Sequence, residues 1–300
     1  ALLSGTPKKE RDEDATGGPL RKIGVSGVLV IKDVTSLLSM GRDPRASVLA
    51  ALREVYDGRW ERNLGSDGGK TLDWTGRIVV IGACTTAWDE HQTVVASMGD
   101  RFVLVRLDSG VGRMAAGRQA LQNTGHEVQM RLELAEAVAG VLSTATGDAS
   151  GSPNPMEEDH LLSAANIVTL ARTAVQTDYR GNVIDRNLPE SPTRFAKQLS
   201  QMFRGGIAIG LSRAAALRLA TRCARDSMPP LRLALIDDLA QHPESLQKDI
   251  RHRLQKPRTT ISKQLEVLLM PGLVWCSDDD SSASTRYSVA GGIDPSVLRI

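Results

Sequence analysis

Apolar runs alternate with a helical pattern over the first third of the chain. Residues 27–38, GVLVIKDVTSLL, begin with the continuous apolar run Val28 to Ile31, which is typical of a strand buried on both faces. Residues 77–86 and 101–107 contain two further apolar runs of this kind. Between the first two runs, residues 43–58 carry apolar side chains at helical spacing, namely Val48, Leu49, Leu52 and Val55. Strands that alternate with helices predict a parallel α/β sheet, with ligands beyond the carboxyl ends of its strands.

Two residues suggest where the helix in 43–58 begins. Asp43 is a candidate N-cap, and Pro44 suits the first helical position because its missing N–H has no helical partner there. Gly58 is a natural stop. We therefore expect a helix that starts after Asp43 and ends before Gly58.

From residue 111 to residue 228 the pattern predicts helices and no strands. The helical segments are 128–142, 161–175, 191–203 and 212–226, and residues 143–159 between the first two form a Gly/Ser/Pro-rich loop. Ser191 and Ser212 stand near the starts of the last two segments, where a hydroxyl caps a helix well. Pro229 and Pro230 mark the next boundary.

Residues 229–300 show three short amphipathic helices followed by a ribbon. The apolar faces are Leu231, Leu235, Ile236 and Leu239, then Leu246, Ile250 and Leu254, then Ile261, Leu265, Leu268 and Leu269. The ribbon strands are 273–277 and 286–290, joined by a polar loop. This order predicts a winged helix-turn-helix that folds alone. Its third helix would direct Arg258, Thr259, Thr260, Ser262 and Lys263 outward, where they could contact DNA phosphates and bases; a protein-contact role is the alternative.

The stretch GSDGGKT, residues 65–71, ends like a phosphate-binding P-loop. The spacing does not fit, because Gly65 and Gly69 are separated by three residues and a P-loop needs four. The flanking segments also resemble two strands, whereas a P-loop joins a strand to a helix. We expect a β-hairpin whose tip carries Lys70.

Composition narrows the class of protein without assigning a function. A length of 300 residues suits two or three domains, and 41% hydrophobic residues suffice for ordinary cores. The net charge of +2 gives no global attraction to nucleic acid, so DNA binding has to rest on local clusters. Three widely spaced cysteines indicate a reducing, cytoplasmic environment, and no segment resembles a membrane helix or signal peptide. The histidines and cysteines form no metal-binding motif, and no GxSxG nucleophile motif occurs.

The order of these segments resembles that of the AAA+ ATPases over residues 20–228. It is most similar to their helicase-type branch with a hairpin before the sensor 1 strand, which includes minichromosome maintenance proteins and ATPases of mobile elements. The resemblance implies a partial P-loop NTPase core in residues 1–110 and a helical lid in 111–228, followed by the winged helix in 229–300. Asp33 matches the Walker B aspartate that holds Mg²⁺; a helix or turn cap is the alternative for this residue.

The resemblance also implies roles for four other residues. Thr85 matches sensor 1, Arg101 the arginine finger that reaches a neighbouring subunit's nucleotide, and Arg194 sensor 2. Lys70 would contact DNA phosphates from the hairpin tip. Three of them have an ordinary structural alternative: a polar strand end for Thr85, and surface cations for Arg101 and Lys70.

The sequence departs from the family in two places. Val34 follows Asp33 where the family usually has a catalytic Glu, and no Walker A motif occurs anywhere. We expect the chain to be the C-terminal part of a bacterial DNA-linked AAA+ ATPase, which would bind ATP and Mg²⁺ between subunits of a homo-oligomeric ring. The alternative is a non-enzymatic winged-helix DNA-binding regulator with a degenerate ATPase domain.

Overall fold

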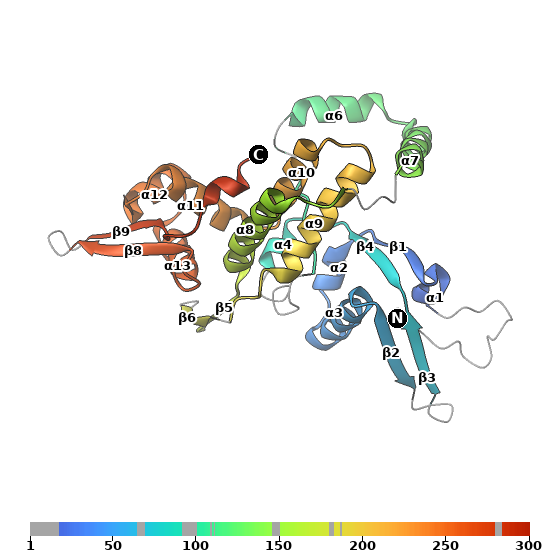
Figure 1. Ribbon diagram of the computed structural model, residues 1–300, viewed down its shortest axis with the longest axis horizontal. Helices are drawn as coiled ribbons and strands as arrows, with labels where there is room; N and C mark the ends of the chain where they lie inside the picture. Colours follow the sequence, from blue (N-terminus) through green and yellow to red (C-terminus); the bar gives the residue numbers. More distant parts are fainter. Residues whose placement is uncertain are drawn as a thin grey trace. The chain divides into compact units, whose positions relative to one another are not determined.

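The structure is a computed structural model that describes residues 18–64, 70–91, 101–108, 110, 112–145, 151–179, 183–186, 188–279 and 284–300. The chain divides into two compact units, Ala1–Arg101 and Phe102–Ile300. Figure 1 labels the elements of both units.

The described residues of the first unit contain a parallel strand pair, a hairpin and four helices. In chain order these are α1 (Pro19–Ile23), β1 (Ser26–Ile31), α2 (Val34–Leu38), α3 (Arg42–Tyr56), β2 (Arg59–Leu64), β3 (Lys70–Thr75), β4 (Arg77–Gly82) and α4 (Ala87–Glu90). β1 pairs with β4 in parallel, from Ser26 opposite Arg77 to Ile31 opposite Gly82. The helix expected in 43–58 is α3, but it begins earlier: its N-cap is Gly41, and no side chain caps it.

One face of the β1–β4 pair is packed and the other is open. On the packed face, Leu29 and Ile31 lie against a cluster of buried leucines from α2 and α3: Leu37, Leu38, Leu49 and Leu52. On the other face, Val28, Val30, Val79 and Ile81 are 52 to 59% exposed. We call these four side chains the open face. The prediction of a strand buried on both faces is therefore wrong for the described part of this unit, because both helices that follow β1 pack on the same side of it.

The hairpin prediction is confirmed by the pairing of β2 with β3. These strands are antiparallel, with Trp60 opposite Trp74. Trp74 is buried against Leu20 and Val55, and its Nε1–H donates to Gly24 O at 2.9 Å. The tip, 65–69, lies outside the described residues, but two strands flank it, which excludes the strand-to-helix setting of a P-loop.

The second unit is mainly helical. Its elements are α6 (Arg113–Gln122), α7 (Glu127–Ser143), α8 (Pro155–Arg172), β5 (Val175–Thr177), β6 (Val183–Arg186), α9 (Thr193–Ala208), α10 (Arg213–Asp226), α11 (Pro230–Gln241), β7 (Ser245–Leu246), α12 (Gln247–Leu254), α13 (Arg258–Leu269), β8 (Val274–Asp279), β9 (Ser284–Val289) and the 3₁₀ helix η3 (Pro295–Leu298).

The strand expected at 101–107 is absent. Residues 101–108 are extended but belong to no sheet. The N–H of Leu104 donates to Ser227 Oγ at 2.9 Å, and the N–H of Arg106 donates to Asp226 Oδ2 at 2.8 Å. These backbone donors are thus used by side chains at the end of α10, so they are not free for a strand ladder.

Two other expectations for residues 111–228 are corrected. Helix α8 begins at Pro155, inside the segment assigned to a loop, because Asn154 and Glu157 form a reciprocal capping box. The antiparallel pair β5–β6 was not predicted; its strands have only three and four residues, too few to give a periodic signal. Ser212 caps α10 as expected. The N-cap position of α9 is Pro192; Ser191 precedes it, and its Oγ accepts the N–H of Thr193 at 3.5 Å and lies 2.6 Å from Thr193 Oγ1.

The last 71 residues follow the order α11, β7, α12, α13, β8, β9, η3. Strands β8 and β9 form the expected ribbon, and the two-residue β7 adds to it, giving an antiparallel sheet with the order β7-β9-β8. β7 was missed because two residues show no alternation of apolar and polar positions.

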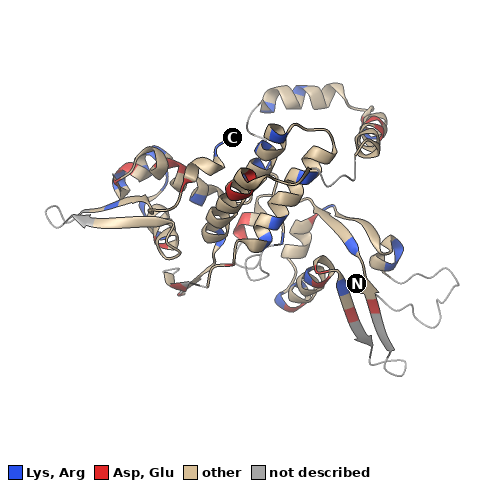
Figure 2. Cartoon of the chain, viewed as in Figure 1, with Lys and Arg blue, Asp and Glu red and all other residues tan. Residues whose placement is uncertain are grey.

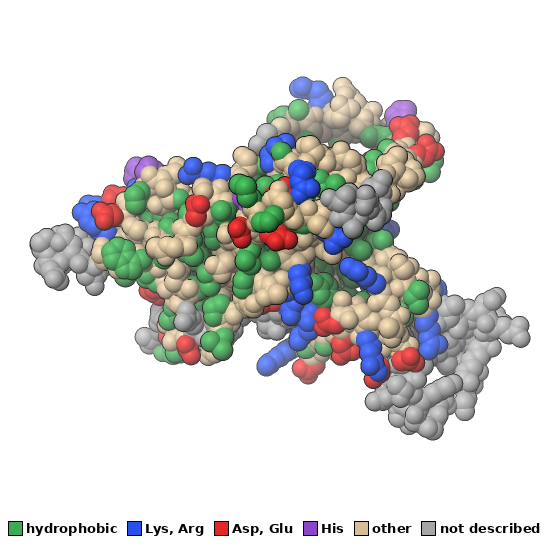
Figure 3. Space-filling model, viewed as in Figure 1, with side chains coloured by type: hydrophobic (Ala, Val, Ile, Leu, Met, Phe, Trp, Pro, Cys, Tyr) green, Lys and Arg blue, Asp and Glu red, His purple; other side chains and the backbone are tan. Residues whose placement is uncertain are grey.

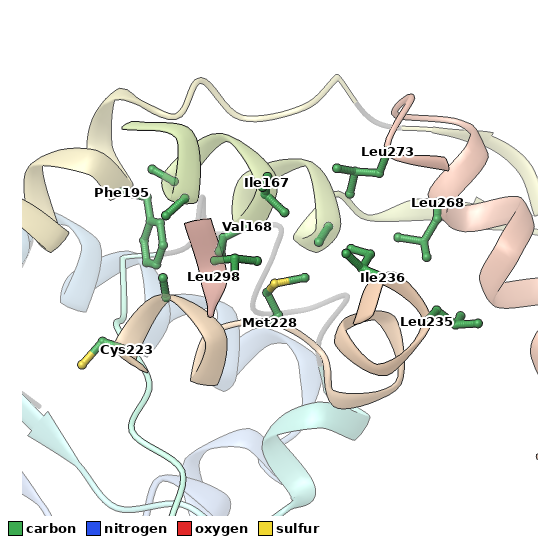
Figure 4. Close-up of a cluster of buried hydrophobic side chains, with 14 of the residues drawn as sticks. Ile167, Val168, Phe195, Cys223, Met228, Leu235, Ile236, Leu268, Leu273 and Leu298 are labelled. Carbon is green, nitrogen blue, oxygen red and sulfur yellow. The ribbon is translucent and has the colours of Figure 1, made fainter. Parts of the chain in front are cut away.

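A single hydrophobic core spans α8 to α13. Figure 4 shows how side chains from both sides of residue 228 meet there: Ile167, Val168, Phe195 and Cys223 from the helical segment, Met228 at the junction, and Leu235, Ile236, Leu268, Leu273 and Leu298 beyond it. The boundary expected at 228/229 therefore does not separate two cores. Cys223, Cys84 and Cys276 are free thiols.

Arg232 of α11 connects the parts of this core before and after residue 228 through hydrogen bonds. Its guanidinium donates to Ala171 O at 2.5 Å and Thr173 O at 3.1 Å, at the carboxyl end of α8, and to Gln264 Oε1 at 3.2 Å. Burial lowers the pKa of Arg232 to about 10. The side chain stays charged at neutral pH and interacts with the negative end of the α8 dipole.

Helices α6 and α7 contribute no buried residue to this unit. The large apolar side chains exposed on α7 are Val128, Met130, Leu132, Leu134, Val138, Val141 and Leu142. Figure 3 shows hydrophobic side chains (green) at the surface along α6 as well.

Candidate functional site

The carboxyl ends of β1 and β4 bring two of the predicted residues to one edge. Beyond the last strand pair, the N–H of Ala83 donates to Ile31 O at 3.0 Å, and the N–H of Val34 donates to Ala83 O at 2.8 Å. The segments that follow β1 and β4 therefore remain side by side for one more residue. This places Asp33 and Thr85 at the same edge of the sheet.

Thr35 connects these two residues. The N–H of Thr35 donates to Asp33 Oδ1 at 2.9 Å, and Thr35 Oγ1 lies 3.3 Å from Thr85 Oγ1 and 3.6 Å from Cys84 Sγ. Thr35 was not among the site residues predicted from the sequence. The signal that could have found it is a hydroxyl residue two positions after the strand-end Asp, in KDVT.

Asp33 also has the structural role that the sequence left open for it, that of a helix cap. It is the N-cap of α2, and Oδ1 accepts the capping hydrogen bond. A carboxylate has two oxygens, so a cap on Oδ1 is compatible with a ligand on Oδ2. Asp33 and Thr85 are exposed, and Thr35 is half-buried.

This edge fits a magnesium ion only in combination with phosphates. Mg²⁺ is commonly held by one or two carboxylates, with waters and substrate phosphates as its other ligands. Asp33 supplies one such carboxylate, and the residues described include no group of three or more His, Cys, Asp or Glu that could hold a metal by themselves. The edge thus fits the metal-binding half of a nucleotide site and lacks the phosphate cradle.

Arg101 is engaged within its own unit. Its guanidinium pairs with Asp57 Oδ2 at 3.0 Å and lies 5.6 Å from the centroid of the Tyr56 ring, and its side chain is 13% exposed. An arginine finger has to reach another subunit, so that role requires Arg101 to leave Asp57 and Tyr56.

Arg194 and Lys70 occupy the positions expected of them along the chain. Arg194 lies in the first turn of α9, in the second unit, and pairs with Glu190. Lys70 is the first residue of β3 and is paired with Leu64 across the hairpin; its side chain lies outside the described residues. Lys70 and Asp33 belong to the first unit, and Arg194 belongs to the second.

The five predicted DNA-contact residues differ in exposure. Arg258 and Thr259 are exposed at the start of α13, whereas Thr260, Ser262 and Lys263 are half-buried. On an ideal helix Val267 points away from Ile261 and Leu265, which face the core. Even so, Val267 is only 5% exposed. The side of α13 that carries Val267 is therefore covered, whereas Thr259 and Glu266 are exposed; strand β6 contacts this helix.

Comparisons with protein-family models, with curated proteins and with solved structures gave no match to this chain. Within the described part of the chain, no helix has the length and apolar character needed to cross a membrane.

Proposed function

We propose that this chain is part of a DNA-linked AAA+ ATPase of the helicase type, with a C-terminal winged helix. The observation that carries the ATPase half is the edge formed by Asp33, Thr35 and Thr85. A carboxylate and two hydroxyls follow adjacent parallel strands there, where α/β sheets bind their ligands. In such a site Asp33 would hold Mg²⁺, which shields phosphate charge, and Thr85 would orient the terminal phosphate or its attacking water.

A second polypeptide segment is required by this proposal. Parallel sheets are ordinarily covered on both faces, and the open face carries four β-branched side chains that would gain from burial. We propose that a P-loop-bearing strand and helix cover this face and supply the phosphate cradle. Homo-oligomerisation as a ring would follow from the finger role of Arg101.

The DNA half of the proposal rests on the C-terminal elements. Three helices and an antiparallel sheet of the order β7-β9-β8 support a winged helix. The three free cysteines favour a cytoplasmic protein. The second candidate function, a DNA-binding regulator without hydrolysis, is favoured by Val34, since no carboxylate follows Asp33 to orient water.

The test begins with the 300-residue chain and ATP-Mg²⁺. We expect no hydrolysis, because its sequence contains no P-loop; metal-dependent turnover that Asp33→Asn abolishes would contradict the need for another segment. The product of the complete gene is then assayed. If it supplies a P-loop, Asp33→Asn should abolish hydrolysis, whereas Asp43→Asn, an exposed acid in the first turn of α3, should not. A complete product without P-loop or hydrolysis would favour the regulator.

A further inference from the structure

The partial burial of α13 limits what this helix can contact in DNA. A recognition helix reads bases by placing its outer side chains in the major groove. Here Thr260, Ser262 and Lys263 are half-buried, and Val267 in the following turn is buried. The exposed residues of this helix are Arg258 and Thr259 in its first turn and the acidic Glu266 further along.

A cluster of cations lies beside this first turn. Residues 247–258, QKDIRHRLQKPR, contain five Lys or Arg residues and the single carboxylate Asp249. Figure 2 shows the Lys and Arg positions of α12 and α13 in blue. All five are exposed. We call the four other than Arg253 the basic surface: Lys248, Arg251, Lys256 and Arg258.

Hydrogen bonds hold the parts of the basic surface together. Gln247 Nε2 donates to Arg258 O at 3.2 Å, so the start of α12 lies against the start of α13. The N–H of Lys256 donates to Arg251 O at 3.3 Å, which closes the turn between the two helices. The four cations therefore belong to one continuous part of the surface.

The fifth cation of this stretch has a different role. Arg253 pairs with both carboxylate oxygens of Asp238 at 2.7 Å and donates to Ser245 Oγ at 2.7 Å, which fixes α12 to α11 and β7. Asp238 raises the pKa of Arg253, first through this hydrogen bond. Asp249 also raises the pKa of Arg253, by a smaller electrostatic interaction.

Exposed cations that lie close together suit the phosphates of a nucleic-acid backbone. Such contacts neutralise charge and release counterions, and they do not depend on base sequence. Base readout would instead need the side chains of α13 beyond its first turn. Of these, Thr260, Ser262 and Lys263 are half-buried, and the exposed Glu266 has the same sign of charge as phosphate.

We propose that the chain binds duplex DNA through the phosphates at the basic surface, without reading base sequence through α13. This inference rests on the proposed DNA-binding function and specifies its site and mode. It adds Lys248, Arg251 and Lys256 to the binding residues.

The test uses the full 300-residue chain and two unrelated DNA duplexes of equal length, with affinity measured over a range of salt concentrations. Replacing Lys248, Arg251 and Lys256 together by Ala should weaken binding to both duplexes equally, and should flatten the logarithmic salt slope by about 3, since each lost phosphate contact removes roughly 0.9. Circular dichroism on each variant checks that it is folded.

Two control variants distinguish the basic surface from total charge and from base readout. Replacing the exposed Arg113, Arg118 and Arg131 of α6 and α7 by Ala removes the same charge elsewhere and should leave the slope unchanged. Replacing Thr259, Thr260 and Ser262 by Ala should leave the affinity ratio of the two duplexes near one.

Three results would contradict the inference. Equal losses in the α12 variant and the α6–α7 variant would show that only total charge matters. A preference for one duplex that disappears in the Thr259/Thr260/Ser262 variant, with no effect of the α12 variant, would restore base readout by α13 and keep the DNA-binding function. Absence of binding to either duplex at low salt would reject the DNA-binding function itself.

Discussion

The two units of this chain bury their apolar side chains to very different extents. The first has separate clusters of four and three buried residues, and its parallel strands expose Val28, Val30, Val79 and Ile81. In the second, one cluster extends from α8 to α13 and includes side chains from η3 near the C-terminus. Because apolar burial is the main favourable term in folding, the second unit has the means to be stable by itself and the first does not.

The largest effect is expected from separating the two units. A protein of residues 102–300 should give a cooperative thermal transition, whereas residues 1–101 should give none, because the small clusters cannot offset the entropy of ordering the chain. Circular dichroism during heating measures both.

A cut at 228/229 sharpens this comparison. It passes through the shared core, so residues 229–300 alone should melt well below residues 102–300, in contrast to the independence expected from sequence. A cooperative transition of residues 1–101 alone, or equal melting of the two C-terminal fragments, would contradict the comparison of the cores.

The second prediction compares single residues from the two regions. Phe203 is fully buried in the core of the second unit, so Phe203→Ala should cost about 3–5 kcal/mol of unfolding free energy. Val30 on the open face is 59% exposed, and Val30→Thr should change stability by about 0.5 kcal/mol or less. Chemical denaturation of the full chain measures both. A cost for Val30→Thr similar to that of Phe203→Ala would mean that this face is buried in solution.

Sequence periodicity predicted the elements that are long and amphipathic, and it failed where contacts with distant segments of the chain determine the structure. The helix α3, the hairpin β2–β3 and the ribbon β8–β9 follow from local patterns. The apolar run at 101–107 gave no strand, because side chains of α10 take up its backbone donors. The short strands β5, β6 and β7 exist through tertiary pairing and have no periodic signal.

The candidate sites show the same division. A strand followed by Asp33 and another followed by Thr85 could be recognised because parallel strands end at one edge. The bridging role of Thr35 depends on the exact register of β1 and β4, which no pattern gives. Similarly, the outward direction of α13 residues follows from helical geometry, but the burial of Val267 and the partial burial of Thr260, Ser262 and Lys263 depend on tertiary packing, in which β6 contacts this helix.

A smaller effect is expected at Arg232, which joins two parts of the stable core. In Arg232→Met the carbonyl oxygens of Ala171 and Thr173 lose their donor, and leaving buried polar groups unsatisfied costs about 1–3 kcal/mol. The measurement is chemical denaturation of residues 102–300. The control is Arg218→Met, an exposed arginine of α10, which should remain within about 0.5 kcal/mol of the wild type. Equal effects of the two variants would show that the buried hydrogen bonds contribute nothing.

The smallest effect is a pH dependence of the second unit that involves His160. This residue of α8 is half-buried, and its Nε2 lies 3.0 Å from Thr221 Oγ1 on α10. Burial lowers the pKa of His160 from the usual 6.5, and Asp294 opposes this shift in part. The unfolded chain therefore takes up a proton more readily than the folded one, so the stability from this site is complete above about pH 6.5 and is lost as the pH falls through the lower folded pKa.

His160→Gln keeps a hydrogen-bonding group and should remove this component from thermal melts between neutral and mildly acidic pH. Asp294→Asn removes the opposing charge and should enlarge the loss, while the acidic titration of Asp294 itself, whose pKa is lowered below 3.8 chiefly by the Ser296 hydroxyl, lies outside this range. An unchanged pH profile in His160→Gln would show that the contact of His160 with Thr221, between α8 and α10, does not titrate.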